Sequence, residues 1–403
     1  MSGQTPKNGT SSSTGLLLFS GEDKPGIAAG IFSALSPFSV KVIDLEQLRI
    51  GDRTIFAMLI LLDPAHASVI ESDLTISANN LQLDFACQIT QHTETLNNSQ
   101  SKAKIILVGN SFTPIQLHKV TSVVTKHAGN IERIVKIADS PVLSMEFLIS
   151  LPAEKISNLR LDLTAIGIET KLAISLLDES RVMQSRKLFI FDIDSTLIQE
   201  EVIDLLAVRA NVGDEVALIT AAAMRGELDF SESLTKRVAL LAGLSETVLT
   251  EIQGKIHLSS GAQNLIKILH SQGHILTAVS GGFIDVIKPL MDDLGFHHYR
   301  ANKLEIISGK LSGKLVGQIV DANTKAQALV EFARITDVPI SQTIAIGDGA
   351  NDLEMIKLAG VGIAYNAKPI LQEAADIVLN IKNLDAIIYL LGLSNLDVTG
   401  GKN

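Results

Sequence analysis

The sequence has little cysteine, no excess of basic charge and no long apolar run, and each shortage excludes a class of protein. One cysteine, Cys87, stands in 403 residues, so an intramolecular disulfide and a cysteine-based metal site are excluded. We expect this thiol to pack as a small apolar group in a reducing, cytoplasmic compartment. The longest apolar runs, such as Ile55–Leu62, are too short to cross a membrane. Residues 1–14 are polar and lack the pattern of a signal peptide, so we expect a disordered tail there.

The charge balance argues against a nucleic-acid-binding protein. Lys and Arg number 34 against 44 Asp and Glu, which gives 34 − 44 = −10, whereas a nucleic-acid surface needs an excess of basic residues. An anionic small substrate remains possible if a few cations gather locally. Hydrophobic residues make up 46%, enough to build real cores. At about 150 residues per domain, the length predicts two or three domains.

Two N-terminal segments, 15–92 and 103–180, show the same order of predicted elements: strand, helix, strand, strand, helix, strand. This order predicts a duplicated ferredoxin-like α+β unit, with Gln91–Ala103 as a polar linker. The elements expected in the first segment are Leu16–Phe19, a helix after Ser20–Gly26, Ser39–Ile50, Thr54–Leu62, Ala67–Asn80 and Leu81–Ile89. Those expected in the second are Lys104–Val108, Ile115–Ala128, Asn130–Ala138, Val142–Ser150, Ala153–Ile166 and Glu169–Leu176.

Beyond residue 185, short apolar strands alternate with helices, which predicts a parallel sheet covered on both faces. Glu200–Gly254 reads as almost entirely helical, with breaks at Gly213, Gly226 and Gly243. The predicted strands are Lys187–Phe191, Ile275–Val279, Thr343–Ile346, Val361–Tyr365 and Ile377–Leu379. Ligands bind at the carboxyl ends of such strands, and polar residues follow three of them here.

The first of these strand ends carries two carboxylates, Asp192 and Asp194. A pair of this kind repels unless a cation or proton separates it, and Mg²⁺ prefers oxygen ligands and also holds phosphate oxygens. Taken alone, the pair is better explained as a helix N-cap.

Three further sequence elements favour a functional site over a helix N-cap. Asp348, Asn351 and Asp352 follow the Thr343–Ile346 strand, and Ser280–Gly282 offers a hydroxyl and backbone N–H groups to a phosphate. Lys325 stands near a predicted helix start. Each alone could be an ordinary turn or a surface lysine. Together they indicate phosphoryl transfer through an aspartyl-phosphate, with a metal and lysine neutralising charge and a second Asp as acid and base. Neither a P-loop nor a dinucleotide-binding glycine motif is present.

These residues resemble the motifs of haloacid dehalogenase-like phosphatases over about Ser185 to Leu391. The segments Phe191–Glu201, Ala223–Phe230, Val279–Phe283 and Ile346–Asp352 look like the phosphoserine phosphatases within that superfamily. The resemblance implies that Asp192 is the nucleophile and Asp194 the general acid and base. It implies Mg²⁺ ligands from the side chains of Asp192 and Asp348 and the backbone carbonyl of Asp194, with Asp352 as an outer carboxylate. Ser280, Gly281 and Lys325 would hold the phosphoryl group, and Asn351 would support it.

The same resemblance makes the helical insert, about 200–258, a cap over the substrate. Glu201 would bind the substrate ammonium and Arg237 its carboxylate, while Met224 and Phe230 would line the wall. A zwitterion needs one anion and one cation, and Arg suits a carboxylate. The alternatives are a helix-capping Glu201, core positions for Met224 and Phe230, and a surface Arg237.

The N-terminal repeats resemble ACT domains, modules that bind amino acids at paired interfaces. Asp23–Gly26 matches the ligand-loop pattern, with Asp23 and Gly26 as the possible effector contacts, whereas Asn110–Ile115 of the second repeat lacks that Asp and Gly. Tandem ACT domains resemble the long bacterial form of the enzyme. Two interpretations stay open: feedback by serine, or only a homodimer interface.

The sequence thus predicts an α/β protein, a Rossmann-like haloacid dehalogenase core with a helical cap over residues 185–403, preceded by two ferredoxin-like (ACT) α+β domains. The expected activity is Mg²⁺-dependent hydrolysis of O-phospho-L-serine to L-serine and phosphate, the last step of L-serine biosynthesis. The alternatives are a phosphatase for another small phosphomonoester, such as phosphothreonine, or an amino acid sensor with a silent phosphatase domain. The intact Asp192, Asp194, Lys325 and Asp348 argue against silence.

Overall fold

The computed structural model describes residues 13–91, 101–178 and 186–393, except the side chain of Met224. The chain divides into two units, Met1–Asn98 and Ser99–Asn403, each described by itself below. Among the described residues, none of the helices combines the length and the apolar character needed to cross a bilayer.

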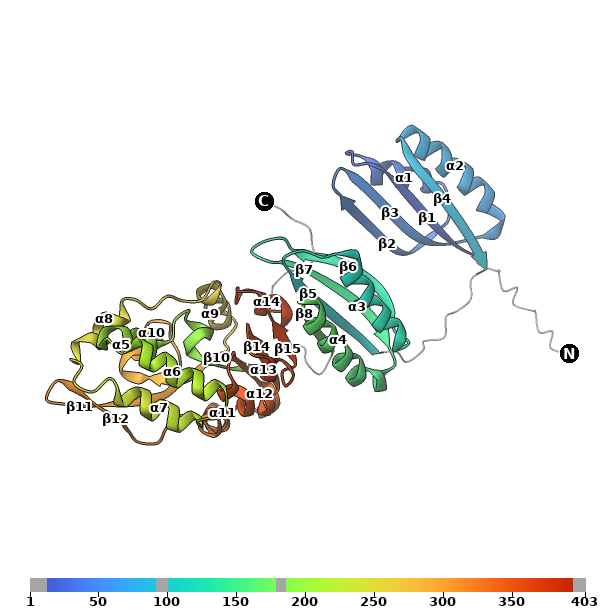
Figure 1. Ribbon diagram of the computed structural model, residues 1–403. Helices are drawn as coiled ribbons and strands as arrows, with labels where there is room; N and C mark the ends of the chain where they lie inside the picture. Colours follow the sequence, from blue (N-terminus) through green and yellow to red (C-terminus); the bar gives the residue numbers. More distant parts are fainter. Residues whose placement is uncertain (1–12, 92–100, 179–185, 394–403) are drawn as a thin grey trace. The chain divides into compact units, whose positions relative to one another are not determined.

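The first unit is a four-stranded antiparallel sheet of order β2-β3-β1-β4 with two helices (Figure 1). Its core joins the inward side chains of β1 and β3 to both helices, and Cys87 packs half-buried against it, as predicted. Every residue of the edge strand β2 is exposed. The elements are β1 (Ser13–Glu22), α1 (Ile27–Leu35), β2 (Lys41–Ile50), β3 (Arg53–Leu62), α2 (Ala67–Asn80) and β4 (Leu83–Gln91).

The second unit begins with a sheet of matching order, β6-β7-β5-β8. The predicted succession of strand, helix, strand, strand, helix, strand is confirmed in both repeats. The elements are β5 (Ser101–Gly109), α3 (Pro114–Lys126), β6 (Asn130–Ala138), β7 (Leu143–Leu151), α4 (Ile156–Thr170) and β8 (Ala173–Asp178).

The predicted polar segments at the ends of the first repeat are too long. Ser13 belongs to β1 rather than to the tail, Gln91 ends β4, and Ser101 begins β5. These polar residues extend the strands because their backbones find partners: Ser13 pairs with Leu62, and Ser101 pairs with Leu151. The remainder of the tail and of the linker lies outside the described residues.

The rest of the second unit is built on a seven-stranded sheet of order β12-β11-β10-β9-β13-β14-β15. The short strand β9 is central and pairs in parallel with β10 and β13, so Asp192 and Asp348 emerge side by side at the carboxyl edge. The strands are β9 (Leu188–Phe191), β10 (Ile275–Phe283), β11 (His298–Ile307), β12 (Lys310–Val316), β13 (Thr343–Gly347), β14 (Val361–Tyr365) and β15 (Ile377–Leu379).

Helices cover both faces of this sheet, as predicted. Phe189 and Phe191 of β9 belong to one core cluster and Leu188 and Ile190 to another, because alternate side chains of a strand point to opposite faces. The first cluster includes α9 (Ala262–Ser271), α10 (Ile284–Asp293) and α14 (Ala386–Leu390). The second includes α11 (Ala322–Ile335), α12 (Leu353–Leu358) and α13 (Pro369–Gln372).

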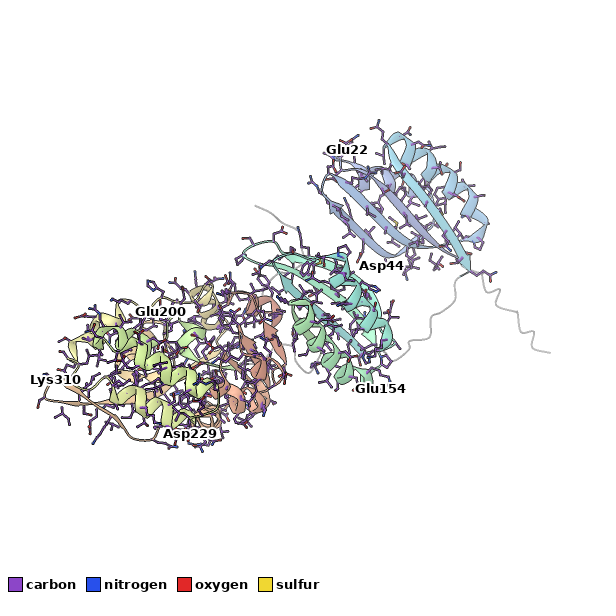
Figure 2. All side chains as sticks on the ribbon, viewed as in Figure 1. Glu22, Asp44, Glu154, Glu200, Asp229 and Lys310 are labelled. Atoms are coloured by element: carbon purple, nitrogen blue, oxygen red, sulfur yellow. The ribbon has the colours of Figure 1, made fainter. Side chains whose placement is uncertain are left out.

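The helical insert forms a cap of four helices that leans on a hairpin the sequence did not predict, β11–β12 (Figure 1). Gly243 N donates to Leu311 O at 2.8 Å, and Leu311 N donates to Leu244 O at 2.8 Å. Lys310, labelled in Figure 2, begins β12 at the turn of the hairpin. The cap helices are α5 (Val202–Ala210), α6 (Gly213–Met224), α7 (Phe230–Ala239) and α8 (Thr247–Gln253).

The two linkers of the cap run side by side. Gln199 N donates to His257 O at 2.9 Å, and Ser259 N donates to Leu197 O at 2.9 Å. The Glu200 carboxylate, labelled in Figure 2, accepts from the backbone N of His257 at 2.9 Å and lies 2.7 Å from its Nδ1. The two linkers of the cap are therefore joined to each other along one hydrogen-bonded line.

The second repeat packs directly on the seven-stranded sheet. Ile106, Val108 and Leu177 belong to the same buried cluster as the residues of α14. Thr164 Oγ1 of α4 also donates to the carbonyl of Asp376, just before β15, at 3.3 Å. The two parts of the second unit thus share one apolar core.

Candidate active site

Asp192 and Lys325 meet at the centre of the carboxyl edge. The Lys325 Nζ lies 2.6 Å from Asp192 Oδ1 and 2.7 Å from Asp352 Oδ1. Lys325 is completely buried, and Asp192 is only 3% exposed. Burying an ammonium without a counter-charge is costly, and the two carboxylates offset this cost for Lys325. The interpretation of Lys325 as a surface lysine is therefore wrong.

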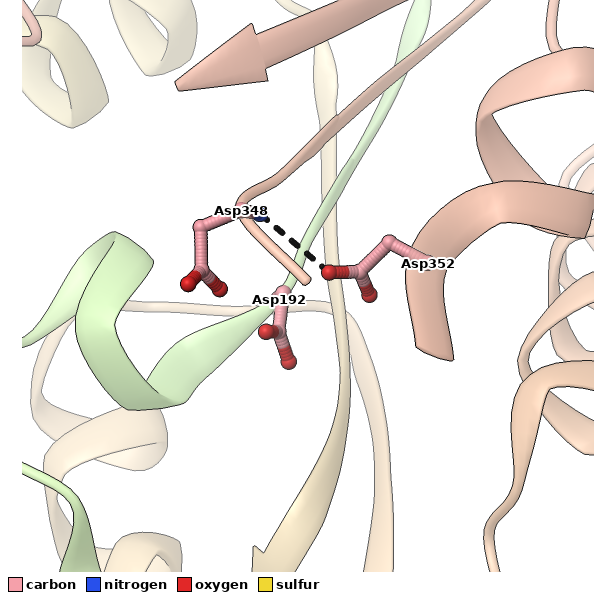
Figure 3. Close-up of side chains that lie close together, drawn as sticks. All are labelled: Asp192, Asp348 and Asp352. Atoms are coloured by element: carbon pink, nitrogen blue, oxygen red, sulfur yellow. Dashed lines mark hydrogen bonds between the residues drawn. The ribbon is translucent and has the colours of Figure 1, made fainter. Parts of the chain in front are cut away.

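Three carboxylates surround one point at this edge (Figure 3). Asp192, Asp348 and Asp352 each offer an oxygen, and these oxygens lie within 4.8 Å of one another. Asp352 also accepts through Oδ2 from the backbone N of Asp348 at 3.2 Å and of Gly349 at 3.0 Å, so it is tied into the loop. Asp192 and Asp348 have more oxygen atoms free than Asp352, which fits the predicted division between inner and outer ligands. Carboxylate oxygens are what a hard divalent cation such as Mg²⁺ prefers.

The protonation equilibria of this cluster indicate a shortage of positive charge. Burial, with Asp352 and Asp348, raises the pKa of Asp192 well above its ordinary value, although Lys325 opposes the rise. Burial and then Asp352 raise the pKa of Asp348 to about 6. Burial would lower the pKa of Lys325, but Asp192 and Asp352 outweigh it and raise that pKa. Three carboxylates against one ammonium leave room for a further cation, and the donor set therefore fits a divalent metal.

Asp194 is held apart from this charge cluster. Its Oδ1 accepts from Val202 N at 2.8 Å, at the start of α5, and its Oδ2 accepts from Ser280 Oγ at 2.8 Å. Burial raises the pKa of Asp194, and these two hydrogen bonds oppose the rise. Ser195 adopts a left-handed backbone with φ of 58°, which turns the chain sharply after the carboxylate.

The glycines after Val279 bring the loop into close contact with the site. A Cβ on Gly282 would lie 2.4 Å from Asp194 Oδ2, so only glycine fits there. A Cβ on Gly281 would lie 2.9 Å from Phe230 Cζ and 3.7 Å from Asn351 Nδ2. The predicted residues Gly281, Phe230 and Asn351 are therefore neighbours.

Glu201 stands at the start of α5 but does not cap it through its side chain. Its Oε1 instead accepts from Ser195 Oγ at 2.7 Å, so the helix-cap alternative is wrong. Burial, followed by Asp194, raises the pKa of Glu201 to about 7. Glu201 is nevertheless exposed by surface area, and water that reaches the carboxylate weakens this effect.

Arg237 on α7 is half-buried and lies near the carboxylates of Glu201, Asp204 and Asp194. Burial lowers its pKa, while Glu201, Asp204 and Asp194 raise it. Within the described part of the chain its guanidinium has no ion-pair partner within 4.0 Å, and its one hydrogen bond goes to Ser233 O at 3.4 Å. The guanidinium is therefore available to a ligand. The side chain of Met224 lies outside the described residues.

Two supporting residues escaped the sequence analysis. Asn302 of β11 is 2% exposed, donates through Nδ2 to Gly281 O at 2.8 Å and accepts from Val320 N at 2.8 Å. The Thr196 hydroxyl lies 3.4 Å from Asp348 Oδ1. An isolated Asn, here between Ala301 and Lys303, carries no sequence signal of such a role.

The predicted effector loop of the first repeat lies far along the chain from these residues. Asp23 pairs with Arg49, with Oδ2 and Nε 3.2 Å apart, and its backbone N donates to Asp52 O at 2.8 Å. Gly26 precedes α1 with φ of 96°. The loop is thus shaped by glycine and closed by one ion pair.

Comparison with known proteins agrees with this architecture. The family of haloacid dehalogenase-like hydrolases matches residues 189–357, and two ACT domain families match 14–88 and 101–176. A phosphoserine phosphatase of Streptomyces coelicolor is 39% identical over 94% of this chain and 92% of its own. A phosphoserine phosphatase of Mycobacterium tuberculosis is 37% identical over 95% of this chain and 94% of its own.

This chain belongs to the phosphoserine phosphatase family.

The solved structures agree with this assignment. A probable phosphoserine phosphatase of Vibrio cholerae, 33% identical, aligns with a TM-score of 0.57 over 72% of this chain and 86% of its own. The predicted haloacid dehalogenase-like fold with two ACT domains is confirmed. This member of the family carries two ACT domains and the hydrolase domain in one chain.

Proposed function

We propose that this chain hydrolyses O-phospho-L-serine to L-serine and phosphate through an aspartyl-phosphate on Asp192. The observation that carries the proposal is the pairing of Asp192 with Lys325 at 2.6 Å, beside a second aspartate, Asp194, that is held separately by Ser280 and Val202. This arrangement supports attack on phosphorus by one carboxylate and proton transfer by the other.

The residues would act in two steps. Asp192 attacks the phosphorus, and protonated Asp194 gives its proton to the departing serine oxygen. Asp194 then takes a proton from the water that hydrolyses the acyl phosphate. The raised pKa of Asp194 suits this exchange of roles. Lys325, Ser280 and the backbone of Gly281 would hold the phosphoryl oxygens, and Asn351 would steady them.

Asp192, Asp348 and the Asp194 carbonyl would hold Mg²⁺, with Asp352 as an outer carboxylate. Bound there, Mg²⁺ would offset the negative charge of the phosphoryl group and the aspartates. The raised pKa values of Asp192 and Asp348 support a cation at this position.

The cap would select the serine part of the substrate. Glu201 would bind the ammonium and Arg237 the carboxylate, and Phe230, beside Gly281, would line the wall with Met224. Small phosphomonoesters that are not amino acids lack one or both of these charged groups, whereas phosphothreonine keeps both and remains the second candidate substrate.

Water labelled with ¹⁸O and a variant pair would test the covalent step. Asp192→Asn should abolish turnover, while Asp214→Asn on the exposed surface of α6 should not change it. Wild-type protein should incorporate one labelled oxygen into phosphate, which shows cleavage of the P–O bond. A quenched reaction should trap an acyl phosphate that hydroxylamine removes, which shows the covalent intermediate. Turnover by the Asp192 variant at the wild-type rate would refute the mechanism.

We propose further that the first ACT domain forms a homodimer and binds an amino acid effector, serine, through Asp23 and Gly26. The edge strand β2 supports a dimer because every residue in it is exposed, including Val42 at 41% and Leu45 at 41%. An unpaired apolar edge of this kind favours association. Leu45→Lys should give monomers in sedimentation velocity, whereas Leu218→Lys on α6 should leave dimers intact.

A further inference from the structure

A cavity of about 250 Å³ lies between the second ACT domain and the catalytic sheet. Ser175 of β8 lines one side, and Thr343, Gly360 and Ile377 line the other, at the amino ends of β13, β14 and β15. Lys187, which immediately precedes β9, also lines it. Asp192 follows the same strand, so the cavity and the active site lie at opposite ends of the central strands.

Lys187 brings a buried positive charge to this cavity without a partner. Lys187 is 7% exposed, and among the described residues its Nζ has no carboxylate within 4.0 Å and makes no hydrogen bond. Its backbone is fixed: its N–H donates to His274 Nδ1 at 3.2 Å, and its carbonyl accepts from Ile275 N at 2.8 Å. Burial lowers the pKa of Lys187. An ammonium withdrawn from water without a counter-charge is costly, so an anion would stabilise it.

Ser175 supplies a second free donor. It is 5% exposed, and its hydroxyl has no hydrogen-bond partner among the residues that the structure describes. The Thr343 hydroxyl, in contrast, is already used, because it donates to Ile340 O at 2.7 Å and accepts from Gly360 N at 3.2 Å. The cavity therefore offers an ammonium and a hydroxyl to one anionic group.

The rest of the lining indicates which chemical groups, apart from the anion, a ligand of this cavity would carry. Among the described residues, no carboxylate lines the cavity, and aliphatic side chains such as Leu177, Ile344 and Leu391 form much of its wall. A ligand ammonium would find no counter-charge here and would be left buried and unpaired. The lining therefore selects against an amino acid zwitterion and favours an aliphatic body.

We propose that this cavity binds a small aliphatic carboxylate that lacks an ammonium group, with the carboxylate on Lys187 Nζ and the Ser175 hydroxyl. Both domains contribute to this site, and it is independent of the proposed substrate site. Its ligand class also differs from the amino acid effector proposed for the first ACT domain.

Calorimetric titration of the full chain with three related compounds tests the proposal. The compounds 4-methylpentanoate, leucine and 4-methylpentan-1-ol share one carbon skeleton, but leucine adds an ammonium and the alcohol lacks the anion. We expect 4-methylpentanoate to bind with one site per chain and to raise the melting temperature. Leucine and the alcohol should bind this site at least about tenfold more weakly, as loss of a charged contact predicts.

Variants locate the binding. Lys187→Met should weaken 4-methylpentanoate about tenfold or more, and Ser175→Val, which also fills space, should weaken it as well. Lys357→Met, at a surface lysine paired with Glu354 at 3.4 Å, should leave it unchanged. Circular dichroism confirms folding of each variant, and either cavity variant suffices if the other unfolds.

Three outcomes would overturn the proposal. The first is no binding of 4-methylpentanoate up to about 10 mM, which would mean that water alone fills the cavity. The second is equal binding by the wild type and a folded cavity variant, which would place the ligand at another site, such as Arg237. The third is leucine binding of equal strength with the same dependence on Lys187. None of these results bears on phosphoserine hydrolysis, which is measured separately.

Discussion

Asp192 and Asp194 are two residues apart yet occupy different electrostatic surroundings. Asp192 contacts an ammonium and two further carboxylates, while Asp194 receives hydrogen bonds from a hydroxyl and a backbone N–H. The sharp turn at Ser195 separates them. This difference explains how neighbouring residues of one type can serve as nucleophile and as acid and base.

The charge of Glu201 should govern the pH dependence of substrate affinity. Because its pKa is raised to about 7, Glu201 becomes neutral as the pH falls below that value and loses its attraction for an ammonium. We expect KM for O-phospho-L-serine to rise from pH 8 to pH 6 in the wild type, and to rise less in Glu201→Gln. The variant should also lose about 10- to 100-fold in kcat/KM, the value of a charge-assisted hydrogen bond.

The matched substrate for this test is 3-phosphooxypropanoate, which keeps the carboxylate and lacks the ammonium. We expect the KM for this compound to be the same in the wild type and in Glu201→Gln. Identical pH profiles for phosphoserine in wild type and variant would contradict the role of Glu201.

Lys325 should control the pH dependence of stability. The pKa of Asp192 is raised in the folded state. Above pH 3.8, the ordinary pKa of this carboxyl, the unfolded chain therefore releases a proton that the folded protein still holds. The free energy of unfolding therefore falls as the pH rises through this window. Lys325→Met removes the ammonium that opposes the shift in the pKa of Asp192. The total fall in the free energy of unfolding should therefore grow by about 1.4 kcal/mol per added pKa unit.

Urea unfolding at pH 5 and pH 8 in the presence of a chelator measures this effect. Lys310→Met, at an exposed position in the β11–β12 turn, is the control and should follow the wild type. A Lys325 variant that gains stability at pH 8 relative to pH 5 would contradict the argument.

At the scale of elements, the predictable parts of the fold are those with a strong apolar pattern. Buried strands such as Leu188–Phe191 are confirmed because nearly every side chain in them is apolar. The hairpin β11–β12 was missed because its strands are half-exposed and interrupted by a buried polar residue, Asn302, whose hydrogen bonds come from segments distant in sequence. The geometry of the carboxylate cluster could not be predicted from the sequence either. The order of the motifs predicts that the carboxylates lie close together, but not which of them contacts Lys325.

The hairpin should position the cap. Gly313 and Gly317 both have φ of 85°, so alanine strains both backbones equally. A Cβ on Gly313 would lie 3.1 Å from Ala239 O and 2.9 Å from Ala242 Cβ, whereas nothing lies within 4 Å of one on Gly317. Gly313→Ala should therefore push α7 outward and lower kcat/KM about tenfold more than Gly317→Ala, because small displacements of positioning residues are costly.

Steady-state kinetics of both glycine variants, together with their melting temperatures, decide this point. Equal losses of kcat/KM would mean that backbone strain alone acts and that the hairpin does not position the cap.

At the scale of the whole molecule, the two ACT domains relate differently to the hydrolase domain. The first belongs to a separate unit, while the second shares buried residues such as Ile106 and Leu177 with α14. A chain starting at Ser99 should therefore keep its melting temperature and kcat. A chain starting at Ser185 should unfold at lower temperature, because removal of the second ACT domain exposes apolar surface at about 25 cal/mol per Å².

Differential scanning calorimetry compares these chains, and serine titration of each shows which domain responds. Equal melting temperatures for the chains starting at Ser99 and Ser185 would contradict the shared core. An identical serine response in the full chain, the chain starting at Ser99 and the chain starting at Ser185 would exclude both ACT domains as the sensor.

The paired linkers of the cap define how a substrate could enter. In a rotation of the cap about these linkers, which would also break its hydrogen bonds to β12, the residues next to Gln199 and His257 move least. Glu201 directly follows this hinge in sequence, whereas Arg237 lies two helices further along the cap. We expect the ammonium contact to be nearly preformed and the carboxylate contact to be made only on closing, so recognition of the two ends of the substrate would be sequential in time.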